Sequence, residues 1–254
     1  MTQAYRGPRA ALLDELRGLS ILLMVLDHGA WDLQNLFGVR VPPLGWPIMA
    51  VLEPAFAGLF IVISGMVCNV SRSNLRRGAL VLGCAAAITA LTSVLMPEQA
   101  VYFGILHLLG ACMVLYAAAG RLLRRAGPVP GAAVCLALFA VLWPLPDGFV
   151  GLPWWRLALP GALYRLPGGF VLGLPAPSFF SGDYFPLLPW GCLFFAGSFA
   201  GRRVFCPGAP GWLFRRRAPV LDWAGRHTLW IYLLHQPVLC AVLWAALGCP
   251  GPKV

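Results

Sequence analysis

Charged residues are scarce in this chain. Of its 254 residues, only 11% are charged, whereas 59% are hydrophobic, and the mean hydropathy is +0.77. A soluble domain carries about 25% charged residues. The composition therefore excludes an ordinary soluble domain and indicates that lipid surrounds most of the chain. No shift in composition and no internal repeat marks a boundary, so we expect one domain over residues 1–254.

Acidic residues are the rarest charged class. The chain has 9 of them against 19 basic residues, which gives a net charge of +10. Such an excess often indicates a nucleic-acid partner. Here a simpler cause exists, because connectors that stay in the cytoplasm retain Lys and Arg. We therefore expect no nucleic-acid partner.

Several familiar signatures are missing. The eight cysteines include no C-x-x-C pair, and most lie in apolar segments, so we interpret them as packing residues and predict no disulfide. There is no P-loop, no dinucleotide fingerprint and no H-E-x-x-H motif. The histidines are scattered without the spacing of a ligand set, so no metal site is predicted.

Long apolar segments are what the chain does have. A helix that crosses a membrane needs about 20 mostly apolar residues. The sequence predicts an all-α, polytopic membrane bundle of about seven transmembrane helices. They are expected at residues 18–37, 46–70, 79–96, 102–120, 129–146, 186–204 and 228–247.

The basic residues give the bundle an orientation. With the N-terminus in the cytoplasm, all basic residues fall on the inner side except Arg40, Arg156, Arg165 and Lys253. The reverse orientation would place most of the positive charge outside, against the usual bias. We therefore predict a cytoplasmic N-terminus in a multi-pass protein of the cell inner or plasma membrane.

One outer connector is unusual. Residues 147–185 are rich in Pro, Gly and aromatics, yet remain apolar. Long loops without secondary structure are usually functional or disordered, and a disordered loop would be polar. This segment is either a lid or re-entrant segment on the outer mouth of the bundle, or an interfacial belt of aromatic side chains.

The first helix carries most of the candidate chemistry. At about 100° per residue, Asp14, Arg17, His28 and Asp32 fall on one stripe, whereas Asp27 lies off it. Ionisable groups inside a membrane are costly and usually functional. The alternative is that these groups only satisfy one another within the bundle.

The residue types on this stripe suit group transfer across a membrane. We assign His28 as the candidate proton-transfer residue, because an imidazole can take and return a proton near neutral pH. Asp32, one turn further along, is expected to reach the His28 ring and orient it. Arg17 lies about 16 Å away at the cytoplasmic mouth, where it is the candidate for holding a phosphate. Asp14, on the same stripe, is assigned with Arg17 to the donor-binding site.

Three later motifs add polar side chains on the predicted outer half. We expect them to surround a substrate cavity, although each residue is equally compatible with a packing role. The motifs are YFGILHLLG with His107, SGDYFPLLPW with Asp183 and Tyr184, and IYLLHQPVL with His235 and Gln236.

These motifs resemble a known family. LDELRGLSILLMVLDHGAWDL and the three later motifs resemble, in order, those of the heparan-α-glucosaminide N-acetyltransferase-like bacterial membrane proteins. The spacing from Arg17 to His28 is also similar to a hallmark of the acyltransferase family 3 membrane enzymes. The resemblance covers nearly the whole chain.

The resemblance implies a membrane acyltransferase. It would move an acyl group, in this family often acetyl, from cytoplasmic acetyl-CoA to a glycan or amino sugar on the extracytoplasmic side. By this resemblance Arg17 is the CoA-side arginine, His28 the intramembrane catalytic histidine, and Asp32 its orienting carboxylate. Direct transfer and an acyl-enzyme on His28 both remain open. The alternatives are a proton-coupled transporter or permease and a non-catalytic membrane scaffold.

Overall fold

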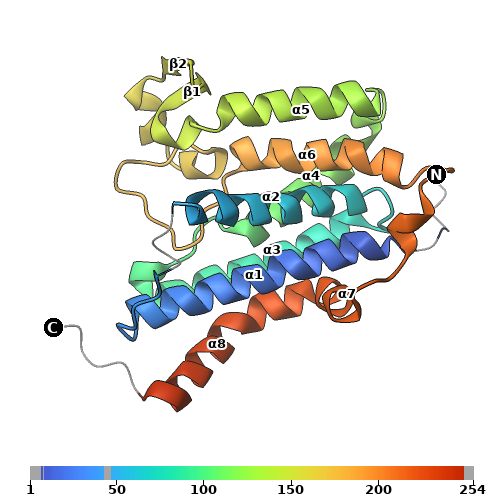
Figure 1. The fold of residues 1–254 in the computed structure, drawn as a ribbon. Coiled ribbons are helices and arrows are strands. Elements are labelled where there is room, and N and C mark those ends of the chain that lie inside the picture. Colours follow the sequence, from blue (N-terminus) through green and yellow to red (C-terminus); the bar gives the residue numbers. More distant parts are fainter. Residues whose placement is uncertain (1–6, 8, 43–46, 249–254) are drawn as a thin grey trace. The chain divides into compact units, whose positions relative to one another are not determined.

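The computed structural model describes residues 7, 9–42 and 47–248 and is mostly helical (Figure 1). Seven long helices and one short helix, α7, account for most of these residues. They are α1 (Ala11–Asn35), α2 (Met49–Val67), α3 (Asn74–Leu95), α4 (Ile105–Leu123), α5 (Pro128–Leu142), α6 (Leu187–Val204), α7 (Pro219–Arg226) and α8 (Thr228–Leu247). Two short strands, β1 (Phe149–Leu152) and β2 (Trp155–Ala158), form a hairpin.

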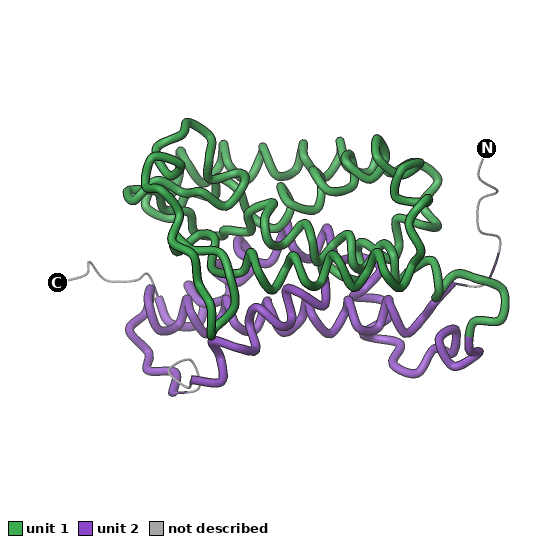
Figure 2. The backbone as a smooth tube through the Cα atoms, turned by 90° about the horizontal axis from the view of Figure 1, so that it is seen from above, with its two compact units in different colours: residues 1–6, 61–209 green, residues 7–60, 210–254 purple. Residues whose placement is uncertain are grey.

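The chain forms two compact units, which Figure 2 shows in different colours. Unit 1 comprises residues 1–6 and 61–209, and unit 2 comprises residues 7–60 and 210–254. The division falls inside α2, so unit 1 holds α3 to α6 and the hairpin, whereas unit 2 holds α1, α7 and α8. The expectation of a single domain over residues 1–254 stays a prediction.

Five stretches of the described chain are long and apolar enough to cross a membrane. They are α2, α3, α4, residues 128–147 and α8. Helices also form at the other two predicted segments, as α1 and α6. Asp27 and Asp32 in α1, and Arg202 and Arg203 at the end of α6, lower the apolar character of these two helices. Seven crossings and a cytoplasmic N-terminus stay predictions.

Some sequence expectations involve residues that the structure does not describe. These are residue 46, where the second expected span begins, together with Arg6, Cys249 and Lys253. The seven cysteines in the described part of the chain are all free.

Glycines allow close helix packing in unit 1. A methyl group on Gly197 of α6 would overlap the backbone carbonyl of Val62, and one on Gly65 would overlap that of Phe194. In membranes, where burying apolar surface gives little gain, small residues at such crossings let backbones approach closely. The interior around them is apolar, with Ile61, Leu108 and Phe194 essentially inaccessible.

The connector between α5 and α6 is more ordered than the sequence predicts. Its strands β1 and β2 pair antiparallel through a two-residue turn, with Leu152 opposite Trp155. Gly151 has a φ of +135° and lies against the Trp155 carbonyl, so this position requires glycine. All four side chains of β2 are exposed, and Trp154 at the turn is 82% exposed. The lid or re-entrant segment and the aromatic interfacial belt both stay predictions.

Unit 2 is organised by α1, which packs against both α7 and α8. The crossing of α1 and α7 depends on two glycines. A methyl group on Gly18 of α1 would overlap the Leu221 carbonyl, and one on Gly225 of α7 would overlap the Asp14 carbonyl. Backbone thus lies against backbone at the N-terminal part of α1, which fixes the position of the polar side chains nearby.

This packing predicts a steep cost for the substitution Gly18→Ala. The added methyl group must push α7 away, so we expect a loss of about 1–3 kcal/mol or more in the free energy of unfolding. Thermal unfolding in detergent measures it. Gly83→Ala in α3 is the matched control, because nothing lies within 4 Å of its added methyl group, and it should unfold no earlier than the parent protein. Equal melting of the two variants would contradict the packing described here.

Candidate functional site

The predicted polar stripe lies on one continuous helix. Asp14, Arg17, His28 and Asp32 all belong to α1, which runs from Ala11 to Asn35 without interruption. Their common face is therefore set by helical periodicity alone. The structure then shows that α8 supplies the partners for three of them.

His28 is paired with a second histidine. Its Nδ1 lies 2.8 Å from Nε2 of His235 on α8, and the ring centroids are 5.0 Å apart. The other nitrogen of His235, Nδ1, lies 2.6 Å from the backbone carbonyl oxygen of Tyr232, one turn earlier in α8. The sequence identified both histidines but gave no sign that their rings meet.

Asp32 makes a different contact from the one expected. Its side chain accepts hydrogen bonds from Nε2 of Gln236 at 3.0 Å (Oδ1) and 2.8 Å (Oδ2), and the residue is only 1% exposed. In the structure Asp32 therefore contacts Gln236, and its expected role in orienting the His28 ring stays a prediction. His235 and Gln236 are consecutive on α8. His28 contacts the first of them, and Asp32 contacts the second.

Two local features of the sequence accompany this pairing. Gly29 follows His28, and a methyl group there would lie 3.3 Å from Cδ2 of Leu239, so the small residue lets α8 approach α1. Pro237 follows Gln236 inside α8. Proline has no N–H, so the helical hydrogen bond from this position to the Leu233 carbonyl is missing. The helix backbone is thus weakened directly beside the two polar side chains.

Arg17 lies toward the N-terminal end of the same stripe. One of its terminal nitrogens, Nη2, donates to Oγ1 of Thr228, the first residue of α8, at 2.7 Å. The other, Nη1, lies 3.9 Å from the Asp14 carboxylate, and the guanidinium lies over the Phe60 ring at 5.5 Å. The side chain is only 15% exposed. These contacts hold the guanidinium at a fixed place between α1 and α8.

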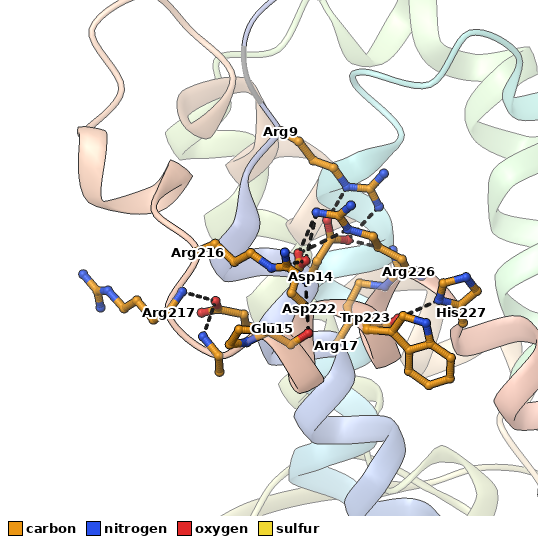
Figure 3. Close-up of polar contacts among 12 residues, drawn as sticks. Arg9, Asp14, Glu15, Arg17, Arg216, Arg217, Asp222, Trp223, Arg226 and His227 are labelled. Carbon is orange, nitrogen blue, oxygen red and sulfur yellow. Dashed lines mark hydrogen bonds and ion pairs between the residues drawn. The ribbon is translucent and has the colours of Figure 1, made fainter.

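A group of arginines and carboxylates surrounds this end of α1 (Figure 3). We call it the arginine–carboxylate cluster, and it consists of Arg9, Asp14, Glu15, Arg216, Asp222 and Arg226. Asp222 on α7 is fully buried and forms ion pairs with Arg216 at 2.8 Å and Arg226 at 2.9 Å. Arg9 pairs with Asp14, and this carboxylate raises the pKa of the Arg9 guanidinium.

Glu15 connects the cluster to the chain before α7. Its Oε1 accepts a hydrogen bond from the Ala218 backbone N–H at 2.8 Å and another from the Arg217 N–H. The guanidinium of Arg217 extends away from the cluster (Figure 3) and is exposed. Sequence reasoning missed this cluster. The four-residue spacing of Asp222 and Arg226 on one helix was the available signal.

Two of the later motifs, YFGILHLLG and SGDYFPLLPW, also come together in unit 1. The backbone carbonyl of Phe103 accepts from the Phe185 N–H at 2.9 Å, and Phe103 and Tyr184 form an isolated bridge. His107 lies within this arrangement. Its Nδ1 accepts from the Gly104 N–H at 3.2 Å, and its Nε2 lies 3.2 Å from Oγ1 of Thr89.

Asp183 and Tyr184 are held by the same segments. Asp183 accepts from the Ile105 N–H at 3.0 Å, so it caps the N-terminus of α4, where a carboxylate is favourable. The Tyr184 hydroxyl donates to the Phe170 carbonyl at 2.7 Å, and burial raises the pKa of this phenol. Both residues thus have structural contacts, and their predicted role in binding a substrate stays a prediction.

A comparison with known families identifies the class of protein. The model described as heparan-alpha-glucosaminide N-acetyltransferase, catalytic, matches residues 9–237. The chain belongs to this family. The match includes the arginine–carboxylate cluster, the His28–His235 pair and the two unit 1 motifs, so the resemblance seen in the sequence is confirmed. No curated protein and no solved structure matches the chain.

Family membership and the apolar helices together indicate a membrane acetyltransferase. Neither shows which of the predicted residues act. In the described part of the chain, no three His, Cys, Asp or Glu side chains are grouped so as to hold a metal ion. The expectation of a reaction without a metal stays a prediction.

The burial of Asp222 predicts a measurable stability effect. Asp222→Asn removes the negative charge that faces two arginines, so we expect a loss of about 1–3 kcal/mol in the free energy of unfolding. The two guanidiniums can turn to solvent, which limits the cost. Glu98→Gln, an exposed acidic residue of the short helix Pro97–Gln99, removes the same charge and should unfold like the parent. If Asp222→Asn also unfolds like the parent, the cluster contributes nothing to stability.

Proposed function

We propose that this protein transfers an acetyl group from cytoplasmic acetyl-CoA to a glycan or amino sugar on the extracytoplasmic side of the cell inner or plasma membrane. In this proposal, about seven helices cross the membrane and the N-terminus is cytoplasmic. Family membership supports the acetyltransferase class. The observation that carries the proposed site is the His28–His235 pair, held between α1 and α8.

The arginines at the N-terminal end of α1 support the proposal that the donor binds at this end. Arg17, Arg9, Arg216 and Arg226 gather there, and Arg217 presents an exposed guanidinium. Guanidinium groups suit the phosphates of CoA, because they are permanently charged and donate paired hydrogen bonds. We propose that Arg17 contacts the donor, and that Asp14 acts by holding Arg9 and Arg17 in place.

The proposed chemistry needs a base within the membrane. Bound acetyl-CoA supplies an acetyl group that is already activated as a thioester. His28 takes the proton that the acceptor hydroxyl or amine loses as its bond to the acetyl carbon forms. It then returns this proton to the sulfur that is released when the C–S bond breaks. The chain carries the proton between the two events and ends in its starting state.

We assign the acceptor to the outer motifs. His107, Asp183 and Tyr184 lie in two segments that are fixed to each other by backbone hydrogen bonds, which gives a rigid frame for an acceptor. The exposed strand β2 and Trp154 offer the aromatic surface that sugars stack on. We further propose that Gln236 holds the Asp32 carboxylate in place.

Removing the His28 imidazole should abolish most of the transfer. With purified protein, radiolabelled acetyl-CoA and a panel of amino sugars, His28→Ala should lower transfer by at least 100-fold, since general base catalysis contributes about 10²–10⁴-fold. His227→Ala is the matched control, because this exposed histidine lies at the start of α8, away from the pair. Transfer that survives in correctly folded His28→Ala would remove His28 from the reaction. Uptake of substrate without acetyl-CoA would favour a transporter instead.

Removing the Arg17 guanidinium should weaken binding of the donor. Arg17→Gln should raise the KM for acetyl-CoA about tenfold or more, because a charge-assisted contact to a phosphate is lost. Arg125→Gln removes an equal charge from the connector between α4 and α5, where the residue is exposed. Equal KM changes in both variants would show that only general surface charge matters, which would contradict a specific role for Arg17.

A further inference from the structure

The contacts of the histidine pair determine where its protons lie. A backbone carbonyl oxygen can only accept a hydrogen bond. The contact at 2.6 Å from Nδ1 of His235 to the Tyr232 carbonyl therefore requires a proton on that nitrogen. In a neutral imidazole the other nitrogen then carries no proton and can only accept. Nε2 of His235 is thus an acceptor.

The same reasoning applies to His28. Its Nδ1 lies 2.8 Å from Nε2 of His235, so the proton in this hydrogen bond belongs to His28. A neutral His28 with a proton on Nδ1 has an unshared electron pair on Nε2. Both rings lie in helices that we propose to span the membrane, where a charged imidazolium is costly, so the neutral forms prevail at rest.

We infer that His235 is a positioning residue, which fixes His28 in the tautomer that leaves Nε2 free to act as a base. The arrangement runs from the Tyr232 carbonyl through His235 to His28, so that the base is oriented by a second group that is itself oriented. The catalytic role of His235 rests on the proposed function, whereas the inferred tautomer of His28 does not depend on it.

The pair also stabilises the protonated state. When His28 takes a proton on Nε2, its Nδ1 still donates to His235, and this hydrogen bond becomes charge-assisted and stronger. In the structure the Asp32 carboxylate contacts Gln236, whereas Nδ1 of His28 contacts His235. We therefore give His235, which the sequence suggests as a substrate contact, the orienting function that the sequence suggests for Asp32.

His107 provides an internal reference with the opposite tautomer. Its Nδ1 accepts a hydrogen bond from the Gly104 N–H, so this nitrogen carries no proton and Nε2 must carry it. The chain has four histidines. One spectrum of the protein should therefore contain both tautomers, at positions that the structure specifies in advance.

Nitrogen NMR of the whole protein in lipid bilayers tests the tautomer directly. With ¹⁵N-labelled histidine at mildly alkaline pH, His28 should show a protonated Nδ1 and an unprotonated Nε2, and His107 the reverse. His28→Gln and His107→Gln assign the signals. A His28 ring protonated on Nε2 and unprotonated on Nδ1 would overturn the inference.

Two substitutions of His235 test its effect on the reaction. His235→Leu keeps the size but removes the acceptor, so we expect kcat to fall about 10–100-fold with an unchanged KM for the acceptor. In His235→Gln the side-chain oxygen can take the place of Nε2, so we expect kcat within about threefold of the parent. Equal kcat in the two variants, or a loss confined to the acceptor KM, would assign His235 to packing or to substrate contact instead.

The two experiments separate this inference from the proposed function. The tautomer is read in the parent protein and needs no turnover. If the protein transfers no acetyl group to any acceptor, the proposed function is wrong. The NMR signals of His28 then still decide whether the inferred tautomer is right. In His235→Leu, the His28 signals should move toward a protonated Nε2, and His235→Gln should preserve the parent pattern. An unchanged pattern in His235→Leu would show that His235 does not fix the tautomer.

Discussion

A polar side chain that is surrounded by lipid must find its partners within the protein. In unit 2 this constraint ties α1 to α8. Arg17 meets Thr228, His28 meets His235, and Asp32 meets Gln236, so polar groups along one stripe are satisfied by one neighbouring helix. In the proposed membrane arrangement, α1 alone would be a poor spanning helix, and α8 supplies the polar groups that pair with its side chains.

The polar stripe has different chemistry at its two ends. Around Arg17 the surroundings are ionic, because carboxylates on α1 and α7 are matched by arginines and the glycine contacts between these helices fix their backbones. Around His28, the described residues place no opposite charge on the ring, and its neighbour is a second imidazole. Fixed positive charge suits the binding of an anionic donor, and a neutral histidine pair suits the movement of a proton. This division supports an enzyme that binds CoA at one end and transfers the acyl group near the other.

The helical segments and the residues of the stripe could be predicted from the sequence, because they follow from apolar length and from the turn per residue. The partners could not be predicted. Periodicity places Asp32 one turn from His28 and so suggested that they pair, whereas the interhelical contact with Gln236 decides the outcome. The spacing of Asp222 and Arg226 suggests an ion pair on one helix, but the complete burial of Asp222 and its second partner, Arg216, depend on tertiary packing. The hairpin of β1 and β2 was missed because its strands are four residues long and the turn contains no Asn-Gly or Asp-Gly signal.

Transfer of label across a sealed membrane tests the central claim most directly. The protein would be reconstituted into liposomes that contain an amino sugar or glycan, and radiolabelled acetyl-CoA would be added only outside. The account predicts acetylated acceptor inside the liposomes, in amounts that follow the protein and vanish in His28→Ala. Label that appears only when donor and acceptor share one side would contradict transfer across the membrane. No acetylation in either arrangement, across the panel of acceptors, would contradict the acetyltransferase itself.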